Sequence, residues 1–322
     1  MKPKLLITEP LNFPKDVLET LRGVFEVHMG AATRSDLLHE SRDADVILVR
    51  LGHRLDTEFF GHAPRLRAIV SATTGLNHID ISAAAQRGIE IISLKGETEF
   101  LRRITVTAEL TWGLLLALVR SIPAACAHTA HGRWNRDEFR DGLQLAGRTL
   151  GILGYGRLGT IVANYGHAFG MRVLVADIRP MELPPWAEQV SHDALYAESD
   201  VITVHVPSAP ETHHLVGRSA FARMQRGAVL INTARGDVID ERALVEALET
   251  GKIAGAALDV LEDEYDAAAT ASSLKLRQLA ACSRRVLITP HIGGASNDAM
   301  ARAETFISEK LLRQWLSLSP QN

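Results

Sequence analysis

Residues 149–159 read T-L-G-I-L-G-Y-G-R-L-G, an apolar strand pattern followed by a glycine-rich turn and the start of a helical pattern. The three glycines of the turn suit this geometry. Gly154 permits a tight turn, Gly156 lets a pyrophosphate approach the backbone, and Gly159 lets the helix pack against the strand. The next strand pattern ends at Asp177, where a carboxylate can bind the hydroxyls of an adenosine ribose. The stretch therefore predicts a Rossmann unit that binds a dinucleotide at a helix N-terminus.

Strand and helix patterns alternate on both sides of this unit, which predicts an α/β fold with two doubly wound parallel sheets. The first sheet is expected from strands at 5–8, 24–28, 46–49, 68–70 and 89–92, with helices such as 14–22 and 33–42 between them. A long helix is expected at 101–121, ended by Pro123. The second sheet is expected from six strands, at 149–153, 172–176, 201–206, 228–232, 254–258 and 286–289, and a last helix at 296–316.

The composition is that of an ordinary globular protein long enough for two domains, with 322 residues, 46% hydrophobic and 23% charged. A net charge of −3 argues against nucleic acid or an anionic membrane as the partner. The N-terminal apolar run is too short for a signal peptide, and the longest apolar stretch, 114–119, is far short of a membrane span. We therefore expect a cytoplasmic protein. Its two cysteines, Cys126 and Cys282, lack metal-ligand spacing and are predicted to be buried free thiols.

Polar side chains follow the strands of the second series, where ligands bind in open parallel sheets. Arg235 follows the fourth strand and His291 the sixth, while Glu264 lies in the loop after the fifth. A guanidinium can hold a carboxylate in two hydrogen bonds, an imidazole can exchange a proton, and a carboxylate can orient that imidazole. Taken singly, Arg235 also suits a surface ion pair, His291 a cap or core histidine, and Glu264 a solvated acidic loop. Together they indicate hydride chemistry on a polar, anionic substrate.

The other histidines give a weaker signal. His205 and the pair His213–His214 are interpreted as structural or surface residues, and no set among the thirteen histidines predicts a metal site.

At these residues the chain resembles the D-isomer-specific 2-hydroxyacid dehydrogenases over nearly its whole length. The resemblance implies a Rossmann NAD-binding domain, residues 99–294, inserted into a flavodoxin-like substrate domain formed by residues 1–98 and 295–322. It also implies closure of a cleft by hinge motion and a homodimer formed through the nucleotide domain. We expect no C-terminal regulatory domain. The segments that carry the resemblance are 151–159 with Asp177, 205–207, 229–238, 256–264 and 289–296.

The resemblance also implies a catalytic set. Arg235 would bind the substrate carboxylate and carbonyl, and His291 would exchange the proton. Glu264, the fifth residue after Asp259, would hold His291. Substrate contacts are expected at Arg50 and, through backbone N–H groups, at Thr74, Gly75 and Leu76. Cofactor contacts are expected at Gly154, Tyr155, Gly156, Arg157, Leu158, Gly159, Asp177, His205, Pro207, Thr212, Thr233, Ala234, Asp259 (for the nicotinamide carboxamide), Gly294 and, on the nicotinamide side, Thr107.

The expected reaction is the reversible reduction of a 2-oxoacid to a D-2-hydroxyacid. Asp177 favours NAD over NADP, although Arg179 nearby leaves NADP open. Among substrates 3-phosphoglycerate is favoured, with Arg50, Arg54 and Arg136 supplying charge for its phosphate. Glyoxylate, hydroxypyruvate and D-lactate are close alternatives.

Other members of the family leave further options open. An NAD-sensing corepressor that acts by binding other proteins is the alternative of a different class, and phosphite oxidation is a minor one. Formate oxidation is disfavoured, because relatives that oxidise formate carry Gln in place of Glu beside the histidine. One departure from the family pattern is Tyr265, which stands where the family usually has proline after the catalytic glutamate.

Overall fold

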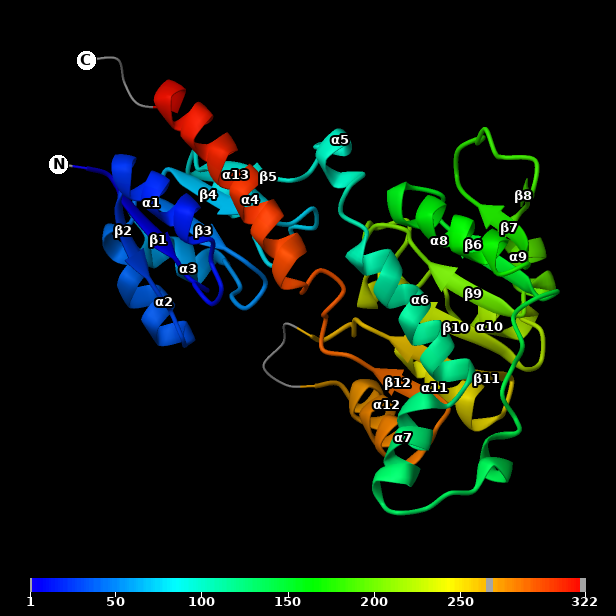
Figure 1. Cartoon of the computed structure of the whole chain (residues 1–322). Coiled ribbons are helices and arrows are strands. Elements are labelled where there is room, and N and C mark those ends of the chain that lie inside the picture. The colour runs from blue at the N-terminus through cyan, green and yellow to red at the C-terminus, as the bar shows by residue number, and fades with distance from the viewer. Residues whose placement is uncertain (1, 265–268, 319–322) are drawn as a thin grey trace. The chain divides into compact units, whose positions relative to one another are not determined.

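The structure, a computed structural model, describes residues 2–264 and 269–318. The chain divides into two compact units, Met1–Ile104 with Ala295–Asn322 and Thr105–Gly294 (Figure 1). The break after Ile104 assigns the short helix α5 (Thr98–Leu101) to the first unit, whereas the boundary expected from the sequence, after residue 98, divides this helix. Tyr265 lies outside the described residues.

The first unit contains a five-stranded parallel sheet in the order β2-β1-β3-β4-β5, the order of flavodoxin-like folds. Its strands are β1 (Lys4–Ile7), β2 (Glu26–Met29), β3 (Val46–Val49), β4 (Ala68–Ser71) and β5 (Glu90–Ser93). Its other helices are α1 (Lys15–Val24), α2 (Arg34–Glu40), α3 (Thr57–His62), α4 (Ile81–Gln86) and α13 (Asn297–Leu318).

Alternate residues of each buried strand line opposite faces of this sheet, as the period of two requires. In β3, Val46 and Leu48 belong to a core packed with α1 and α13, whereas Ile47 and Val49 belong to a core packed with α2, α3 and α4. Both faces are therefore covered, which explains why the strands of a parallel sheet read as continuous apolar runs.

The second unit contains a seven-stranded parallel sheet in the order β12-β11-β10-β9-β6-β7-β8, with the reversal of order between β6 and β9. This confirms the predicted α/β fold with two parallel sheets. The sequence missed β8, because its residues A-E-Q form an exposed edge strand without an apolar run. The strands are β6 (Thr149–Leu153), β7 (Arg172–Ala176), β8 (Ala187–Gln189), β9 (Val201–Val204), β10 (Ala228–Asn232), β11 (Ile253–Leu258) and β12 (Val286–Ile288).

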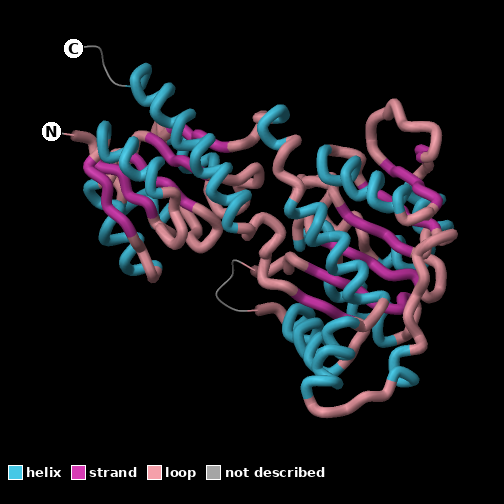
Figure 2. The backbone as a smooth tube through the Cα atoms, viewed as in Figure 1, coloured by secondary structure: helices cyan, strands magenta, loops and turns pink. Residues whose placement is uncertain are grey.

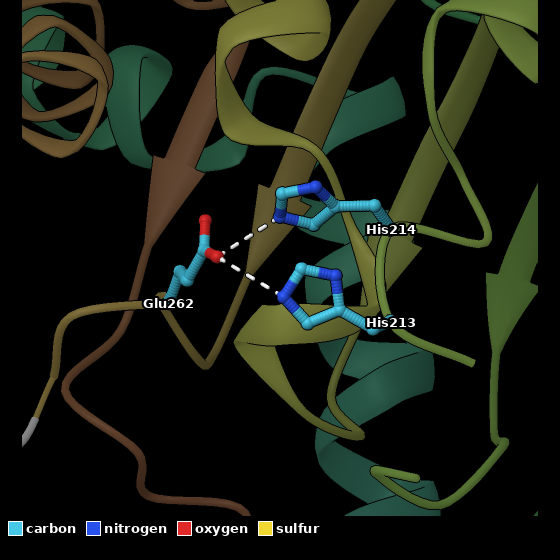
Figure 3. Close-up of side chains that lie close together, drawn as sticks. All are labelled: His213, His214 and Glu262. Carbon is cyan, nitrogen blue, oxygen red and sulfur yellow. Dashed lines mark hydrogen bonds and ion pairs between the residues drawn. The ribbon is translucent and has the colours of Figure 1, made fainter. Parts of the chain in front are cut away.

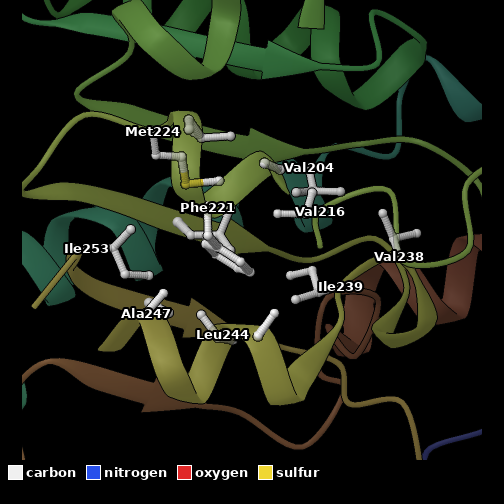
Figure 4. Packing of buried hydrophobic residues seen from close by; sticks show 14 of the residues in the cluster. Val204, Val216, Phe221, Met224, Val238, Ile239, Leu244, Ala247 and Ile253 are labelled. Carbon is white, nitrogen blue, oxygen red and sulfur yellow. The ribbon is translucent and has the colours of Figure 1, made fainter. Parts of the chain in front are cut away.

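Helices cover both faces of the second sheet (Figure 2). On one face α6 (Val106–Val119) and α8 (Arg157–Ala168) pack over Leu150, Ile152 and Val229. On the other face Leu153, Ile202 and Leu230 pack against residues of four further helices. Phe221 and Leu244 belong to this core (Figure 4). The four helices are α9 (His192–Glu198), α10 (Arg218–Arg223), α11 (Glu241–Glu249) and α12 (Ala271–Cys282).

The predicted helix 101–121 is wrong at both ends. Residues 98–101 form a separate helix, α6 ends at Val119, and a further helix, α7 (Ile122–Ala130), follows. Ser121 between them has a left-handed φ of 50°, and Pro123 lies in the first turn of α7, where its missing N–H is tolerated. Within residues 2–264 and 269–318 no single helix is long and apolar enough to cross a membrane. Only by length and composition would the segments 98–119 and 122–130 suffice together, and they are bent by 62° relative to each other.

The prediction that both cysteines are buried is also wrong. Cys126 on α7 and Cys282 at the end of α12 are exposed, not buried. A free cysteine behaves as a small hydrophobe, so its residue type gave no hint of an exposed position.

Candidate active site

The glycine turn after β6 has the geometry of a nucleotide-binding loop. Gly154 has a φ of +94°, and a side chain on it would collide with the backbone of His205. A Cβ on Gly159 would lie 2.1 Å from the carbonyl oxygen of Gly154, so only glycine lets α8 start this close to the turn. Gly156 is the N-cap of α8, and a Cβ placed on it would have no other atom within 4 Å. The loop therefore leaves a backbone cradle at a helix N-terminus, which suits a pyrophosphate.

Asp177, directly after β7, closes this loop from the neighbouring strand. Its Oδ2 accepts the backbone N–H of Tyr155 at 2.9 Å, and its Oδ1 accepts the N–H of Arg179 at 3.1 Å. Burial raises the pKa of Asp177, but these hydrogen bonds outweigh that effect, so the pKa lies below its usual value. Ile178 beside it is 92% exposed, a large apolar surface that the sequence reasoning missed.

The segment after β9 begins with a neutral histidine. The Nε2 atom of His205 lies 2.9 Å from Oγ1 of Thr203, and burial lowers the pKa of His205 to about 4. The imidazole is therefore uncharged at neutral pH. Thr212 closes the following turn, because its hydroxyl donates to the carbonyl of Pro207 at 2.7 Å.

The loop after β10 is fixed by a residue that the sequence reasoning did not single out. Asn232 is buried, and its side chain accepts the N–H of Ala234 at 3.0 Å and donates to the carbonyl of Arg235 at 2.8 Å. Thr233 is anchored separately, by a 2.6 Å hydrogen bond to Thr111 of α6. An asparagine at the end of a buried strand was the available signal, since a buried amide must bond to nearby backbone.

Gly236 brings this loop against the segment that carries Glu264. A Cβ on Gly236 would lie 2.1 Å from the carbonyl carbon of Leu261, so the two backbones touch. Any side chain at position 236 would therefore push Arg235 away from the loop that contains Glu264.

His291 and Glu264 form the predicted pair. Nδ1 of His291 lies 2.9 Å from Oε1 of Glu264, and both side chains are partly buried, at 23% and 17% exposed. An acceptor at Nδ1 fixes the tautomer with a proton on that nitrogen and assigns proton exchange to Nε2. His291 has a left-handed φ of 53°, a conformation that costs energy in a non-glycine residue and is concentrated at functional sites.

Asp259 holds the turn that positions His291. It is 1% exposed, and it accepts hydrogen bonds from Thr289 Oγ1 at 2.6 Å and from the N–H groups of Ile292 and Gly293 at 2.9 and 2.8 Å. Burial raises the pKa of Asp259 above its usual value, although these hydrogen bonds oppose the shift. Thr107 of α6 ties down the same turn by donating to the carbonyl of Gly293 at 2.9 Å.

Apart from Thr107 and Thr111 of α6, these residues lie at one edge of one sheet. They follow the carboxyl ends of six parallel strands that are neighbours in the sheet, from β12 to β7. The strand order therefore brings together the glycine turn, Asp177, His205, Thr233, Arg235, Asp259 and His291, as the sequence predicted.

Arg50 in the first unit donates hydrogen bonds to groups of its own unit. It follows β3, and its Nε donates to Oε1 of Glu304 on α13 at 2.6 Å while its guanidinium also donates to the carbonyl of Leu11 at 2.9 Å. Its backbone N–H donates to Oε2 of Glu9 at 2.6 Å. Glu304 is 1% exposed, and its burial raises the pKa of its carboxyl group while Arg50 opposes the shift. A buried carboxylate thus compensates the charge that was expected to meet a substrate.

Thr74 and Gly75 lie in the loop that follows β4, the strand beside β3 in the same sheet. Thr74 is exposed and Gly75 half-buried, and Thr73 supports the turn by donating to the carbonyl of Gly75 at 2.7 Å. Leu76 is partly buried in the core beneath. The first unit therefore presents backbone at this edge.

Arg136 is not near His291, contrary to the expectation that it serves a substrate phosphate. It begins a short 3₁₀ helix, Arg136–Phe139, whose Glu138 carbonyl accepts a hydrogen bond from Arg284. Arg284 precedes the amino end of β12, whereas His291 follows the carboxyl end. The two arginines therefore lie at the opposite edge of the sheet.

A sequence profile of the D-isomer specific 2-hydroxyacid dehydrogenase NAD binding domain matches residues 112–293, more than half of the chain. The chain belongs to this family. The matched residues lie within the second unit, which is therefore the NAD binding domain characteristic of this family.

Relatives from this family are similar to the chain over nearly its whole length. Glyoxylate reductase of Aeropyrum pernix is 34% identical over 325 residues, covering 97% of this chain and 92% of that relative. D-3-phosphoglycerate dehydrogenase of Methanocaldococcus jannaschii is 36% identical over 318 residues, covering 96% of this chain. This chain spans 56% of that longer relative. D-lactate dehydrogenase of Aquifex aeolicus, solved with NAD and lactic acid, has a TM-score of 0.84 at 32% identity, covering 98% of this chain and 95% of its own.

Proposed function

We propose that this chain catalyses the reversible transfer of a hydride between NAD and a 2-oxoacid, with the D-2-hydroxyacid as the reduced product. The observation that carries the proposal is the 2.9 Å contact between His291 and Glu264 at the edge that also holds Arg235 and the glycine turn. Membership of the dehydrogenase family supports it. A glutamate beside the histidine is the pairing expected for a hydroxyacid rather than for formate.

Each group has a role that follows from its chemistry. The bound cofactor supplies the hydride. Arg235 binds the substrate carboxylate and stabilises the charge that develops on the carbonyl oxygen. His291 donates a proton from Nε2 during reduction and takes it back during oxidation, while Glu264 stabilises the imidazolium form through Nδ1.

Among 2-oxoacids we propose a small substrate without a phosphate, such as glyoxylate or hydroxypyruvate. Two of the three arginines expected to serve a phosphate support this choice by their positions. Arg50 is bound by the buried Glu304, and Arg136 lies at the opposite edge of the second sheet. This reverses the preference for 3-phosphoglycerate that the sequence alone suggested.

The proposal for the cofactor is NAD rather than NADP. Asp177 is ionised and lies where the adenosine ribose binds in Rossmann folds, so it repels a 2′-phosphate. Replacing Asp177 with Ser should reduce the preference for NADH over NADPH, measured as the ratio of kcat/KM values, by about tenfold. A wild-type enzyme that prefers NADPH would overturn this part of the proposal.

We also propose that the chain works as a cytoplasmic homodimer formed through the second unit. Trp134, in the connection between α7 and β6, is 92% exposed, which is unusual for so large an apolar side chain and suits a protein interface. Light scattering coupled to size-exclusion chromatography tests this, and Trp134→Ser should weaken the dimer. A monomer at micromolar concentration would contradict it.

The activity is tested by incubating the protein with NADH and each of several 2-oxoacids and measuring the loss of absorbance at the nicotinamide band. Glyoxylate, hydroxypyruvate, pyruvate and 3-phosphohydroxypyruvate form the panel. We expect turnover that is fastest with an unphosphorylated member. Absence of turnover with NADH still bound would refute the enzymatic function and favour a binding protein of the corepressor kind.

A further inference from the structure

Two neighbouring histidines and a glutamate gather outside the catalytic pair. His213 and His214 follow the turn closed by Thr212, and Glu262 lies in the loop after β11 (Figure 3). Nε2 of His214 lies 2.9 Å from Oε1 of Glu262, and Nε2 of His213 lies 3.9 Å from the same oxygen. One ligand atom from each residue fits within 4.8 Å of the other two.

The backbone is bent to bring both imidazoles to the same side. Residues 210–214 form a turn in which the N–H of His213 donates to the carbonyl of Ala209 at 3.0 Å, and His214 has a left-handed φ of 52°. Its N–H donates to the carbonyl of Asp237 at 2.8 Å, and the two rings lie with centroids 4.0 Å apart. A strained non-glycine conformation that aims two imidazoles at one carboxylate is a feature concentrated at functional sites.

Glu262 is held in place by buried neighbours. Its backbone N–H donates to Oε1 of Glu241 at 2.9 Å, and Glu241 is 3% exposed. Ser273 in turn bonds Oε2 of Glu241 and, at 2.8 Å, Oδ1 of Asp263. The backbone of Glu262 and the side chain of Asp263 are therefore held, while the three side chains of the cluster remain accessible to solvent, at 54%, 37% and 32% exposed.

The spacing suits a tetrahedral metal ion. Zinc bonds to histidine nitrogen and carboxylate oxygen are about 2.0–2.1 Å long, so tetrahedral ligand atoms lie roughly 3.3 Å apart. The two observed separations, 2.9 and 3.9 Å, lie on either side of that value, and small side-chain rotations would equalise them. Two imidazoles and one carboxylate form a donor set typical of zinc with a position left for water.

We propose that His213, His214 and Glu262 form a binding site for a divalent transition metal of the zinc class. A bound ion joins the turn at 213–214 to the loop that carries Glu264, so it stabilises the second unit. The proposal does not depend on the dehydrogenase activity. It also revises the interpretation of this histidine pair as structural or surface residues.

The test is calorimetric titration of the untagged full chain with zinc chloride, after stripping with a chelator. We expect one ion per chain with micromolar or tighter binding, and a rise in the melting temperature with zinc because the ion binds the folded state. Cobalt in place of zinc should give the intense visible bands of a low-coordinate site.

Three variants and a control decide the ligands. His214→Asn keeps a residue that tolerates the left-handed conformation, His213→Gln changes an exposed side chain, and Glu262→Gln removes the charge. Each should weaken zinc binding by more than about tenfold and abolish the zinc-dependent rise in melting temperature.

The control is His28→Ala, which removes an exposed imidazole 3.1 Å from the single carboxylate of Glu26 and should leave zinc binding unchanged. The melting temperature without zinc checks that each variant is folded, and a variant that fails this check is decided by the other two. No stoichiometric zinc binding by the wild type, or binding that survives in the folded variants, would overturn the proposal.

Discussion

The two sheets of this chain obey the same topological rule but use their carboxyl edges differently. In the second unit, the loops after β10, β11 and β12 contain Arg235, Glu264 and His291, and the supporting bonds come from Asn232 and Asp259. In the first unit, the loop after β3 contains Arg50, whose charge is compensated by a carboxylate of its own unit, and the turn after β4 presents backbone at residues 73–75.

The comparison shows that the position of a side chain at a strand end and its role in ligand binding are separate matters. Position at the carboxyl edge of a parallel sheet says where a ligand can bind. Whether a side chain there serves the ligand depends on whether the fold already satisfies its charge. Arg50 and Glu304 answer that question within the first unit, because an isolated charge at the 1% exposed Glu304 would be costly.

The largest effect is expected from His291→Asn. Asparagine tolerates the left-handed backbone of this position but cannot exchange the proton, so kcat should fall about 10²–10⁴-fold. The affinity for NADH, measured by fluorescence titration, should stay close to wild type. A variant that keeps near-normal kcat would remove His291 from the reaction.

Arg235→Lys comes next. The lysine keeps the charge but loses the planar fork that grips a carboxylate, so kcat/KM should fall about 10²–10³-fold. The affinity for NADH again serves as the control. Near-normal turnover would show that the guanidinium is not needed at this edge.

Arg50→Met tests the other edge through stability rather than catalysis. It leaves the buried Glu304 without its partner, so the free energy of unfolding should fall by about 3–5 kcal/mol, measured by urea denaturation. The matched control is Lys4→Met, which breaks the exposed pair with Asp43 and should cost less than about 1 kcal/mol. Unchanged stability with a large rise in KM would instead assign Arg50 to the substrate and erase the contrast between the two edges.

The smallest effect concerns the pH dependence that His205 gives to the second unit. Its pKa is about 4 in the folded chain and 6.5 ordinarily, so the unfolded state binds more protons between these values. Stability is therefore complete above pH 6.5 and declines as the pH falls toward 4, by at most about 3 kcal/mol. His205→Gln should flatten this decline in melting experiments at pH 7 and 5. An unchanged slope would mean that His205 titrates normally.

Much of the fold could be predicted from local sequence. The strands β6, β7 and β10 have the bounds that the sequence predicted, because a strand buried on both faces is apolar along most of its length. The glycine turn was readable because Gly154 and Gly159 occupy positions where any side chain collides with backbone. The pairing of His291 with Glu264 came from family spacing, since the acidic run itself did not distinguish Glu262 from Glu264.

What escaped prediction depends on contacts between distant residues. Nothing near Arg50 in the sequence reveals Glu304, which reaches it from the last helix. The grouping of Glu262 with His213 and His214 likewise needs the close approach of two loops at Gly236. The break at Ser121 depends on one left-handed residue that apolar periodicity does not detect.

The most direct test of the proposed chemistry is the configuration of the product. The wild-type enzyme and His291→Asn are incubated with NADH and the fastest 2-oxoacid that yields a chiral product, and the 2-hydroxyacid is resolved by chiral chromatography. We predict the D enantiomer alone from the wild type and product near background from the variant. The L enantiomer, or undiminished D product from His291→Asn, would contradict the assignment of this sheet edge as the catalytic centre.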